Sequence, residues 1–420
     1  GKDSPVNIDI TKEGKANARF ENSTPIKNSK FNKRQSRNQA ISVLTAEEAT
    51  AYGFDEMESC TLPSNGELDC NAEPRISGAR KKNHISEITT YRADGARYIY
   101  GIPVYNTHQK EVSFNASKKD GNPLEIDQLN GTVKYTNGVN TTNNDRGFDH
   151  YYSSTTLPGY AYSYLLTAVL SADYVDRTGD GPSDDDFGTY TKFNYKKYSS
   201  NYKWRTPYAE QSANFDEGFK PDPYDDKGHY IYGEKEIWYL QSITTKTMVA
   251  EFSLSKRNDS RGVKDEDGGP ASGNDVGQTT QKLDKITLYS KCERRDKKEA
   301  AIPLQEVHFV YDKDYSLCPF VPNNQGATDN LKKGKLTLKE IYFTYQNSLK
   351  GKLSSYRFSY SDFDENYNHP YSLQSCDRWG NYKPNDPDFP NDDFPYSEQD
   401  REKADRYAAS WSLTKIELPS

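Results

Sequence analysis

The sequence predicts a mainly β protein made of two antiparallel β-sheet units, sandwich-like or meander-like, with a few short helices and long polar loops. The 420 residues include 33 Tyr, 17 Phe and 4 Trp, and aromatic side chains favour the pleated surface of a sheet over a helix. The 27 Gly and 21 Pro supply the turns that such a fold needs. Several runs also alternate apolar and polar residues with a period of two, which is typical of strands.

Composition argues against two classes of protein. No apolar run reaches the roughly 18 residues that a membrane-spanning helix requires. The net charge is −7, and Lys and Arg are spread along the chain instead of gathering into the basic patch that nucleic acids attract. We therefore expect no nucleic-acid partner and no membrane-spanning segment.

A chain of 420 residues exceeds the usual size of one core, so we expect two β domains. Residues 255–280 have almost no apolar content and many Gly, Asp and Ser, which predicts a linker there. Because the chain begins and ends in the middle of its pattern, we expect it to be a fragment of a longer polypeptide. The predicted units are an extended N-terminal segment with one short helix at 1–82, a β domain at 83–254, a linker loop at 255–282 and a second β domain at 283–420.

In the N-terminal half, Thr45 and Glu48 have capping-box spacing and Gly53 suits the end of a helix, so we expect one helix at 46–52. The runs on either side of Asp94-Gly95 predict a β-hairpin, because Asp-Gly is a preferred two-residue turn.

The stretch from Leu157 to Phe193 is the one with readable chemistry. Its first part places apolar side chains at three- and four-residue steps, which predicts a short helix with one buried face. These residues are Tyr162, Leu165, Leu166, Val169 and Leu170.

The second half alternates apolar and polar residues between turn signals, as a meander or a sandwich does. The predicted strands are 282–289, 306–311, 335–345 and 356–360, and a polar helix is expected from Ser397 to about Ser410.

Directly after the predicted helix, an acidic loop has the ligand spacing of a calcium site. Oxygen-bearing residues occupy its first, third, fifth and ninth positions, Gly181 at the sixth allows a sharp turn, and the carbonyl of Pro182 would complete the shell. Calcium takes six to eight oxygens at about 2.3–2.6 Å. The predicted ligands are Asp176, Thr178, Asp180, Pro182 and Asp184, and Asp185 or Asp186 would add charge.

The loop is not an EF-hand, because Phe187 occupies the twelfth position, where that motif has Glu. It is similar to the shorter DxDxDG-type loops of β-rich extracellular proteins, and a calcium ion there would be structural. The alternative is a solvated acidic turn, since Asp, Gly, Ser and Pro are ordinary turn residues.

Among the five cysteines, Cys60 and Cys70 bracket a turn-rich loop that would close as a disulfide in an oxidising compartment. The sequence leaves the oxidised and free forms equally open. Cys292, Cys318 and Cys376 lack CxxC spacing, so we expect no zinc site.

Two further patterns have both structural and functional interpretations. Residues 202–208 (YKWRTPY) gather aromatic and basic side chains, either as Lys and Arg packed over rings or as a platform for sugar rings. Glu234 and Glu236 lie two residues apart on a predicted strand. Without a second carboxylate pair across a cleft, we interpret them as a solvated strand face and not as a glycosidase pair.

A resemblance to a known family rests on motifs spread over residues 84–420. Together they resemble the region that precedes the YD or RHS repeats in very large secreted or cell-surface proteins of Bacteroidota, which are similar to wall-associated and toxin-complex-like RHS proteins. The motifs are YGIPVYN at 100–106, SYLLTAVL at 163–170 followed by DYVD at 173–176, TGDG at 178–181, YGEKEIW at 232–238 and DRWGNY at 377–382.

The resemblance implies a location outside the cell or on the outer-membrane surface, with export by the type IX secretion system. It also implies that the repeats of the longer polypeptide form a β-cocoon, although no repeat unit is visible in these residues. The expected partners are the YD/RHS-type remainder of the same polypeptide and components of the type IX translocon.

Two classes of function follow from the sequence. The first is a non-catalytic β scaffold segment of such a large protein, with a structural calcium loop. The alternative is a carbohydrate-binding or carbohydrate-active extracellular protein that uses aromatic platforms. The sequence contains no GxSxG, HExxH or Walker motif, which favours the scaffold.

Overall fold

The computed structural model describes residues 6–10, 16–20, 39–54, 56–119, 121–127, 130–218, 222, 224–273, 275, 277–361, 368–373, 375–377, 379–384 and 400–419. It confirms the predicted fold class, because strands dominate, helices are few and short, and every strand pairing in the described residues is antiparallel.

The strands are β1 Val6–Ile10, β2 Ala16–Phe20, β3 Gln39–Thr45, β4 Glu56–Thr61, β5 Asp69–Pro74, β6 Ile85–Arg92, β7 Arg97–Tyr100, β8 Ile102–Asn115, β9 Glu125–Asp127, β10 Thr132–Lys134, β11 Tyr152–Leu157, β12 Tyr160–Leu165, β13 Ala168–Leu170, β14 Tyr190–Thr206, β15 Ser212–Asp216, β16 Lys227–Thr244, β17 Met248–Arg261, β18 Thr279–Ser290, β19 Gln305–Tyr311, β20 Leu338–Thr344, β21 Tyr356–Tyr360 and β22 Leu413–Glu417. The α-helices are α1 Ala46–Ala51, α2 Lys291–Lys297 and α3 Arg401–Ala408, and the short 3-10 helices are η2 Lys298–Ala300, η3 Asn330–Lys332 and η4 Lys350–Leu353.

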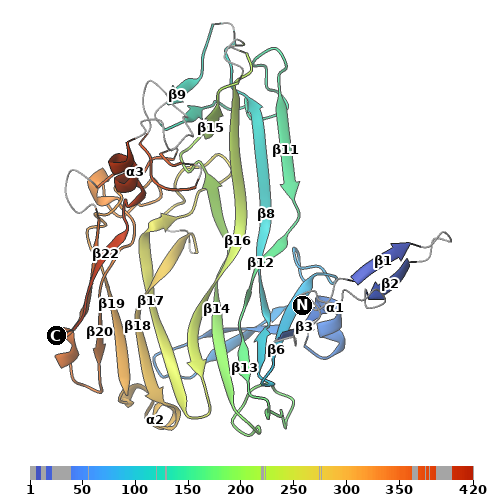
Figure 1. Ribbon diagram of the computed structural model, residues 1–420, viewed down its shortest axis with the longest axis vertical. Coiled ribbons are helices and arrows are strands. Elements are labelled where there is room, and N and C mark those ends of the chain that lie inside the picture. The colour runs from blue at the N-terminus through green and yellow to red at the C-terminus, as the bar shows by residue number, and fades with distance from the viewer. Residues whose placement is uncertain are drawn as a thin grey trace, which may run out of the picture.

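The long strand β16 lies at the centre of the molecule (Figure 1). It pairs with β14 along one edge and with β8 along the other, and β8 pairs in turn with β11 and β12. The strands β1 and β2 form one separate hairpin and β4 and β5 form another, while the remaining strands belong to a single connected network of pairings in which β22 is an edge strand.

Strands β17 to β22 form a meander, which we call the outer meander. It joins the lower end of β16, where Ser242 pairs with Glu251 of β17, and each later strand pairs with the next one in sequence. Figure 1 shows these strands side by side along one flank of the molecule.

Buried apolar clusters lie in the part of the chain from β4 to β16. The largest lies between β8, β10, β15 and β16 and includes Val112, Phe114, Val133, Phe215 and Tyr230. A second cluster joins Met57 of β4 to Trp238 of β16. The third, which includes Leu170 and Tyr190, lies beside the acidic loop.

The predicted helix over 162–170 is wrong, because these residues form strands β12 and β13. In β12, Leu165 pairs with Ile102, and in β13, Ala168 pairs with Ile99. A bulge at Tyr162 and the break between the two strands shift the alternation of apolar side chains. The apolar positions therefore fall three and four residues apart and imitate a helical period.

Other local predictions are confirmed. Helix α1 begins after Thr45, whose hydroxyl accepts from Glu48 N at 3.2 Å while the Glu48 carboxylate accepts from Thr45 N at 2.8 Å. Gly95 adopts a φ of 85° in the turn between β6 and β7, a conformation that glycine reaches at little cost. Helix α3 begins at Arg401 with Asp400 as its cap, and the predicted start at Ser397 lies outside the described residues.

The stretch 255–282 holds more structure than its linker-like composition suggests. Residues up to Arg261 belong to β17 and those from Thr279 belong to β18, and the two strands pair. The described residues between them fold back onto the molecule, where Val263 and Ala271 are buried and Val263 N donates to Lys203 O. Because β17 pairs with both β16 and β18, one sheet runs across the expected boundary, and the division into two domains stays a prediction.

No helix in the described ranges has the length and apolar character needed to cross a lipid bilayer.

Candidate interaction face

The acidic loop between β13 and β14 is closed by its own hydrogen bonds. Val175 and Phe187 pair across its base. The Asp176 carboxylate accepts backbone N–H groups from Thr178 at 3.2 Å, Gly179 at 2.6 Å and Gly181 at 3.0 Å. These bonds satisfy the Asp176 carboxylate as in an Asx turn.

Among the other predicted ligands, Thr178, Asp180 and Asp184 already have hydrogen-bond partners within the protein. The hydroxyl of Thr178 donates to Asp180 at 2.6 Å, and Pro182 is half-buried. Asp184 accepts from the hydroxyl of Tyr190 at 2.8 Å and from Lys291 Nζ at 2.5 Å. The carboxylates of Asp176, Asp180 and Asp184 do not gather within 4.8 Å of one another. The calcium site therefore stays a prediction, and these contacts hold the loop without an ion.

Asp186 is the most buried carboxylate of the loop and is only 3% exposed. Burial would raise its pKa, but hydrogen bonds from Arg177 N, the Tyr174 hydroxyl and Ser183 N outweigh this effect and lower the pKa to about 2. Asp186 thus stays charged and holds the two ends of the loop together.

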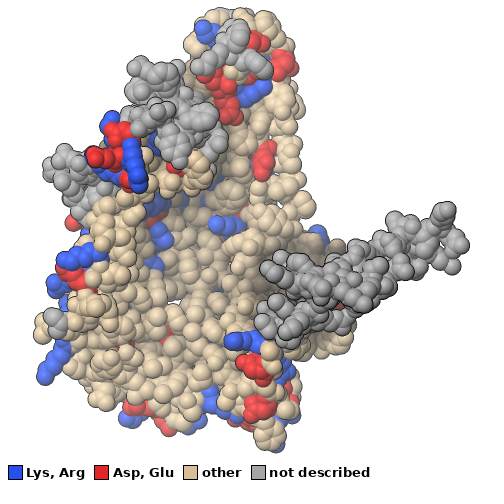
Figure 2. Space-filling model, in the orientation of Figure 1, with Lys and Arg blue, Asp and Glu red and all other residues tan. Residues whose placement is uncertain are grey.

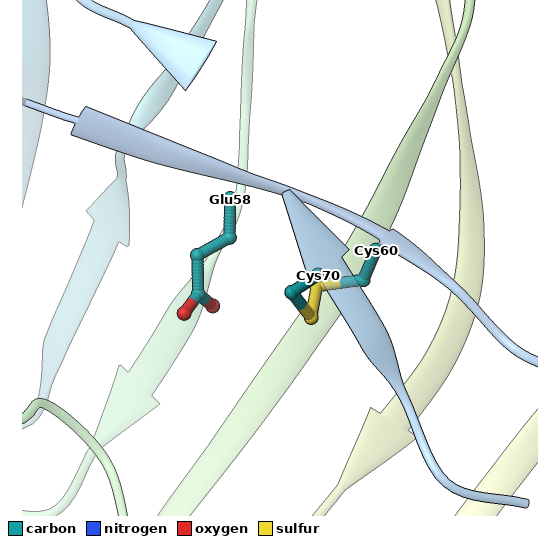
Figure 3. A group of neighbouring side chains, drawn as sticks. All are labelled: Glu58, Cys60 and Cys70. Atoms are coloured by element: carbon teal, nitrogen blue, oxygen red, sulfur yellow. A yellow bond between two sulfur atoms is a disulfide. The ribbon is translucent and has the colours of Figure 1, made fainter. Parts of the chain in front are cut away.

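One group of three potential metal ligands occurs among the described residues, namely Glu58, Cys60 and Cys70 of the β4–β5 hairpin (Figure 3). Cys60 and Cys70 face each other in the register and form a disulfide, so their sulfur atoms are not free thiolates. The sequence left the oxidised and free forms of these cysteines open, and the structure confirms the oxidised form. The remaining carboxylate of Glu58 forms an ion pair with Lys192 at 3.2 Å.

The aromatic and basic residues at 202–208 serve mainly as packing. Tyr202 is buried and donates to Ser260 O at 3.3 Å. Arg205 is also buried, with its guanidinium 4.3 Å from the centre of the Tyr230 ring. The Trp204 ring lies against Gly233, where any side chain would collide with it. These contacts match the interpretation of basic side chains packed over rings.

The expectation of a solvated strand face is wrong for Glu236, which is 3% exposed. Arg80 donates to its carboxylate at 2.6 Å, and Lys197 Nζ lies 3.5 Å away. Further hydrogen bonds come from Tyr105 N at 3.2 Å and Trp238 Nε1 at 3.4 Å. Sequence reasoning missed this centre because Arg80 lies 156 residues before Glu236.

Around Glu236, the N-terminal part of the chain is held against the central strands. Lys197 also pairs with Glu73 of β5 at 2.8 Å, and its backbone N–H donates to Ser59 of β4 at 3.0 Å. Arg75 donates to Ser86 O at 3.2 Å and to Gly101 O at 3.0 Å. The β4–β5 hairpin and the segment after it are therefore fixed by buried polar contacts.

The outer meander and the adjoining ends of β14 and β16 share one mainly apolar face, which we call the apolar face. Its polar residues include Gln305, which pairs with Leu288, and Ser290, which pairs with Met248. Residues that pair directly across antiparallel strands point to the same side. Phe252, Ile286, Val307 and Phe343 form one such row across four strands. The apolar residues that form this face are Phe193, Ile243, Ala250, Phe252, Ile286, Leu288, Val307, Phe309, Ile341, Phe343, Tyr356, Phe358 and Ile416.

The opposite side of the same strands is polar and charged. Lys285 pairs with His308, and the adjacent Thr287 pairs with Glu306. Lys285 Nζ donates to the Glu306 carboxylate at 2.7 Å. Helix α2 contacts this side through Arg294, which donates to Glu251 at 2.6 Å and to Ser64 O of the β4–β5 loop. The charged side is therefore the one that other elements touch.

Within the six strands β17, β18, β19, β20, β21 and β22 themselves, all of whose residues are described, no hydrophobic side chain is buried. Members of the apolar face are half-buried by their neighbours in the sheet, and Ile416 at the edge strand β22 is 51% exposed. Figure 2 shows few charged side chains over the middle of the broad surface formed here. Nothing in the described residues covers this face, although contiguous apolar surface of such size normally marks an interaction site.

No protein family model matches the chain, and no curated protein or solved structure shows significant similarity to it.

Proposed function

We propose that the chain is a non-catalytic, β-rich scaffold segment of a large secreted or cell-surface protein of the YD/RHS-like kind. The observation that carries the proposal is the apolar face, because a sheet with one uncovered apolar side is built to receive another layer of protein. A scaffold role also agrees with the structural use of Glu236 on the central strand β16, because its buried carboxylate pairs with Arg80.

Location outside the cell is part of the proposal. The Cys60–Cys70 disulfide supports it, because disulfides persist in oxidising compartments. Export by the type IX system, and partners among the YD/RHS-type remainder of the polypeptide and the translocon, come from the sequence resemblance alone. Detection of the protein on intact cells or in the medium of its source organism would test this part.

The alternative is a carbohydrate-binding or carbohydrate-active protein. It has less support, because Tyr202 and Arg205 of the proposed aromatic platform are buried and the Trp204 ring is packed against β16.

A hydrophobic dye that fluoresces in apolar surroundings tests the scaffold proposal. We expect the dilute chain to bind the dye, and Val307→Lys to reduce binding by placing a charge on the apolar face. The matched control is Val310→Lys on the same strand, which points to the charged side opposite Glu340. A chain that binds no dye, or that loses binding equally in both variants, would remove the observation on which the proposal rests.

A further inference from the structure

The chemistry of the apolar face defines what can cover it. Its thirteen members carry no charge, from Phe193 on β14 to Ile416 on β22. A charged group placed against such a surface would lose its hydration without gaining a partner, which costs several kcal/mol per ion. The covering surface must therefore be uncharged and apolar as well.

The dimensions of the face decide which kind of element fits. Strands lie about 4.8 Å apart, so the six strands from β17 to β22 span roughly 29 Å, and about six residues per strand span roughly 20 Å. One helix, about 10 Å wide, would cover only two of these strands. A second sheet packed face to face at a distance of about 10 Å would cover all of them.

We propose that this layer is the same apolar face of a second copy of the chain, packed about a two-fold axis. The inference rests on the proposed scaffold function and names its partner. A two-fold contact brings identical patches together, so a face without charge meets no like charge. Two faces of roughly 600 Å² would bury roughly 1,200 Å² in total, which reaches the standard size of specific interfaces.

This arrangement also agrees with the asymmetry of the meander. The charged side already contacts α2 and the loop of the disulfide-closed hairpin through Arg294, so it would remain on the outside of the dimer. Dimer formation would bury the residues of the apolar face further, and it would leave the contacts on the charged side in place.

Analytical ultracentrifugation of the 420-residue chain over a range of concentrations tests the proposal. We expect a reversible dimer, and we expect Val307→Lys to raise its dissociation constant by more than ~100-fold, because the symmetry buries the new charge twice. Val310→Lys should leave the dissociation constant within about threefold of that of the unmodified chain. Circular dichroism would verify that both variants fold. If Val307→Lys does not fold, Ile341→Lys serves as a second variant of the apolar face.

The outcomes separate this proposal from the scaffold function. A chain that stays monomeric at every concentration but binds the hydrophobic dye overturns the second copy as occupant and leaves the scaffold proposal intact. A monomer that binds no dye contradicts both proposals. A dimer that Val307→Lys and Ile341→Lys leave unchanged has its interface elsewhere, which also overturns the inference.

Discussion

Strands β8 and β19 have the same pattern of alternating apolar residues, but these residues differ in how deeply they are buried. On β8, Val112 and Phe114 are fully buried in the largest core cluster. On β19, Val307 and Phe309 belong to the apolar face and are only half-buried. The comparison shows that alternation determines which side of a strand is apolar, whereas burial depends on whether another element covers that side.

The largest expected difference between the two regions is in stability. Phe114→Ala should lower the free energy of unfolding by about 3–5 kcal/mol, because it leaves a cavity among close-packed neighbours. Phe309→Ala should lower it by about 1 kcal/mol, since its ring is only half-buried and the site can relax. Urea unfolding of dilute protein measures both values. Equal losses would mean that the apolar face is covered in solution.

The second expected effect concerns the polar contacts of the covered region. Arg80→Ala leaves the buried Glu236 carboxylate without its closest cation and should cost about 3 kcal/mol of unfolding free energy. The control is Lys82→Ala, whose partner Glu47 is exposed, and it should cost less than about 0.5 kcal/mol.

A double variant separates the charge from the packing of Arg80. Adding Glu236→Gln to Arg80→Ala should restore part of the stability, because no unpaired charge then remains buried. If the double variant is no more stable than Arg80→Ala, the loss comes from the side-chain packing of Arg80.

The smallest expected effect concerns the acidic loop, whose own hydrogen bonds already satisfy Asp176 and Asp184. If the predicted calcium site forms, a tenfold excess of calcium over its dissociation constant should add about 1.4 kcal/mol to the unfolding free energy. The melting temperature should then fall in EDTA. Asp180→Ala should abolish this difference, and Glu234→Ala should leave it unchanged.

For metal-free protein, identical melting curves with calcium and with EDTA would contradict the site. The loop would then be the solvated turn that its composition also allows.

Local chemistry explains which parts of the fold could be predicted. The capping box of Thr45 and Glu48 and the turn at Gly95 depend on residues close in sequence, and both were predicted correctly. Strands β19 and β20 were also predicted, because their alternation is uninterrupted over most of their length. Strand β12 was mistaken for a helix, because the bulge at Tyr162 breaks the period on which the prediction depends.

The buried contacts of Glu236 and the uncovered apolar face were less predictable, because they depend on residues far apart in the sequence. Nothing near Glu236 in the sequence indicates that Arg80 will bury its charge. The alternation around Val307 predicts an apolar side, but only the full arrangement of elements reveals that no described residue covers it. The pairing of Cys60 with Cys70 was one of two open alternatives, and the register of the β4–β5 hairpin decides between them.

The buried contact between Arg80 and Glu236 also constrains the order in which the chain can assemble during synthesis. Arg80 leaves the ribosome 156 residues before its partner, which corresponds to a delay of roughly 8–30 s at ordinary rates of about 5–20 residues per second. The β4–β5 hairpin can close early, since its strands are neighbours in sequence. The segment around Arg80 must wait for β16, so a segment that is made well before its partner reaches its final place only when that partner has been made.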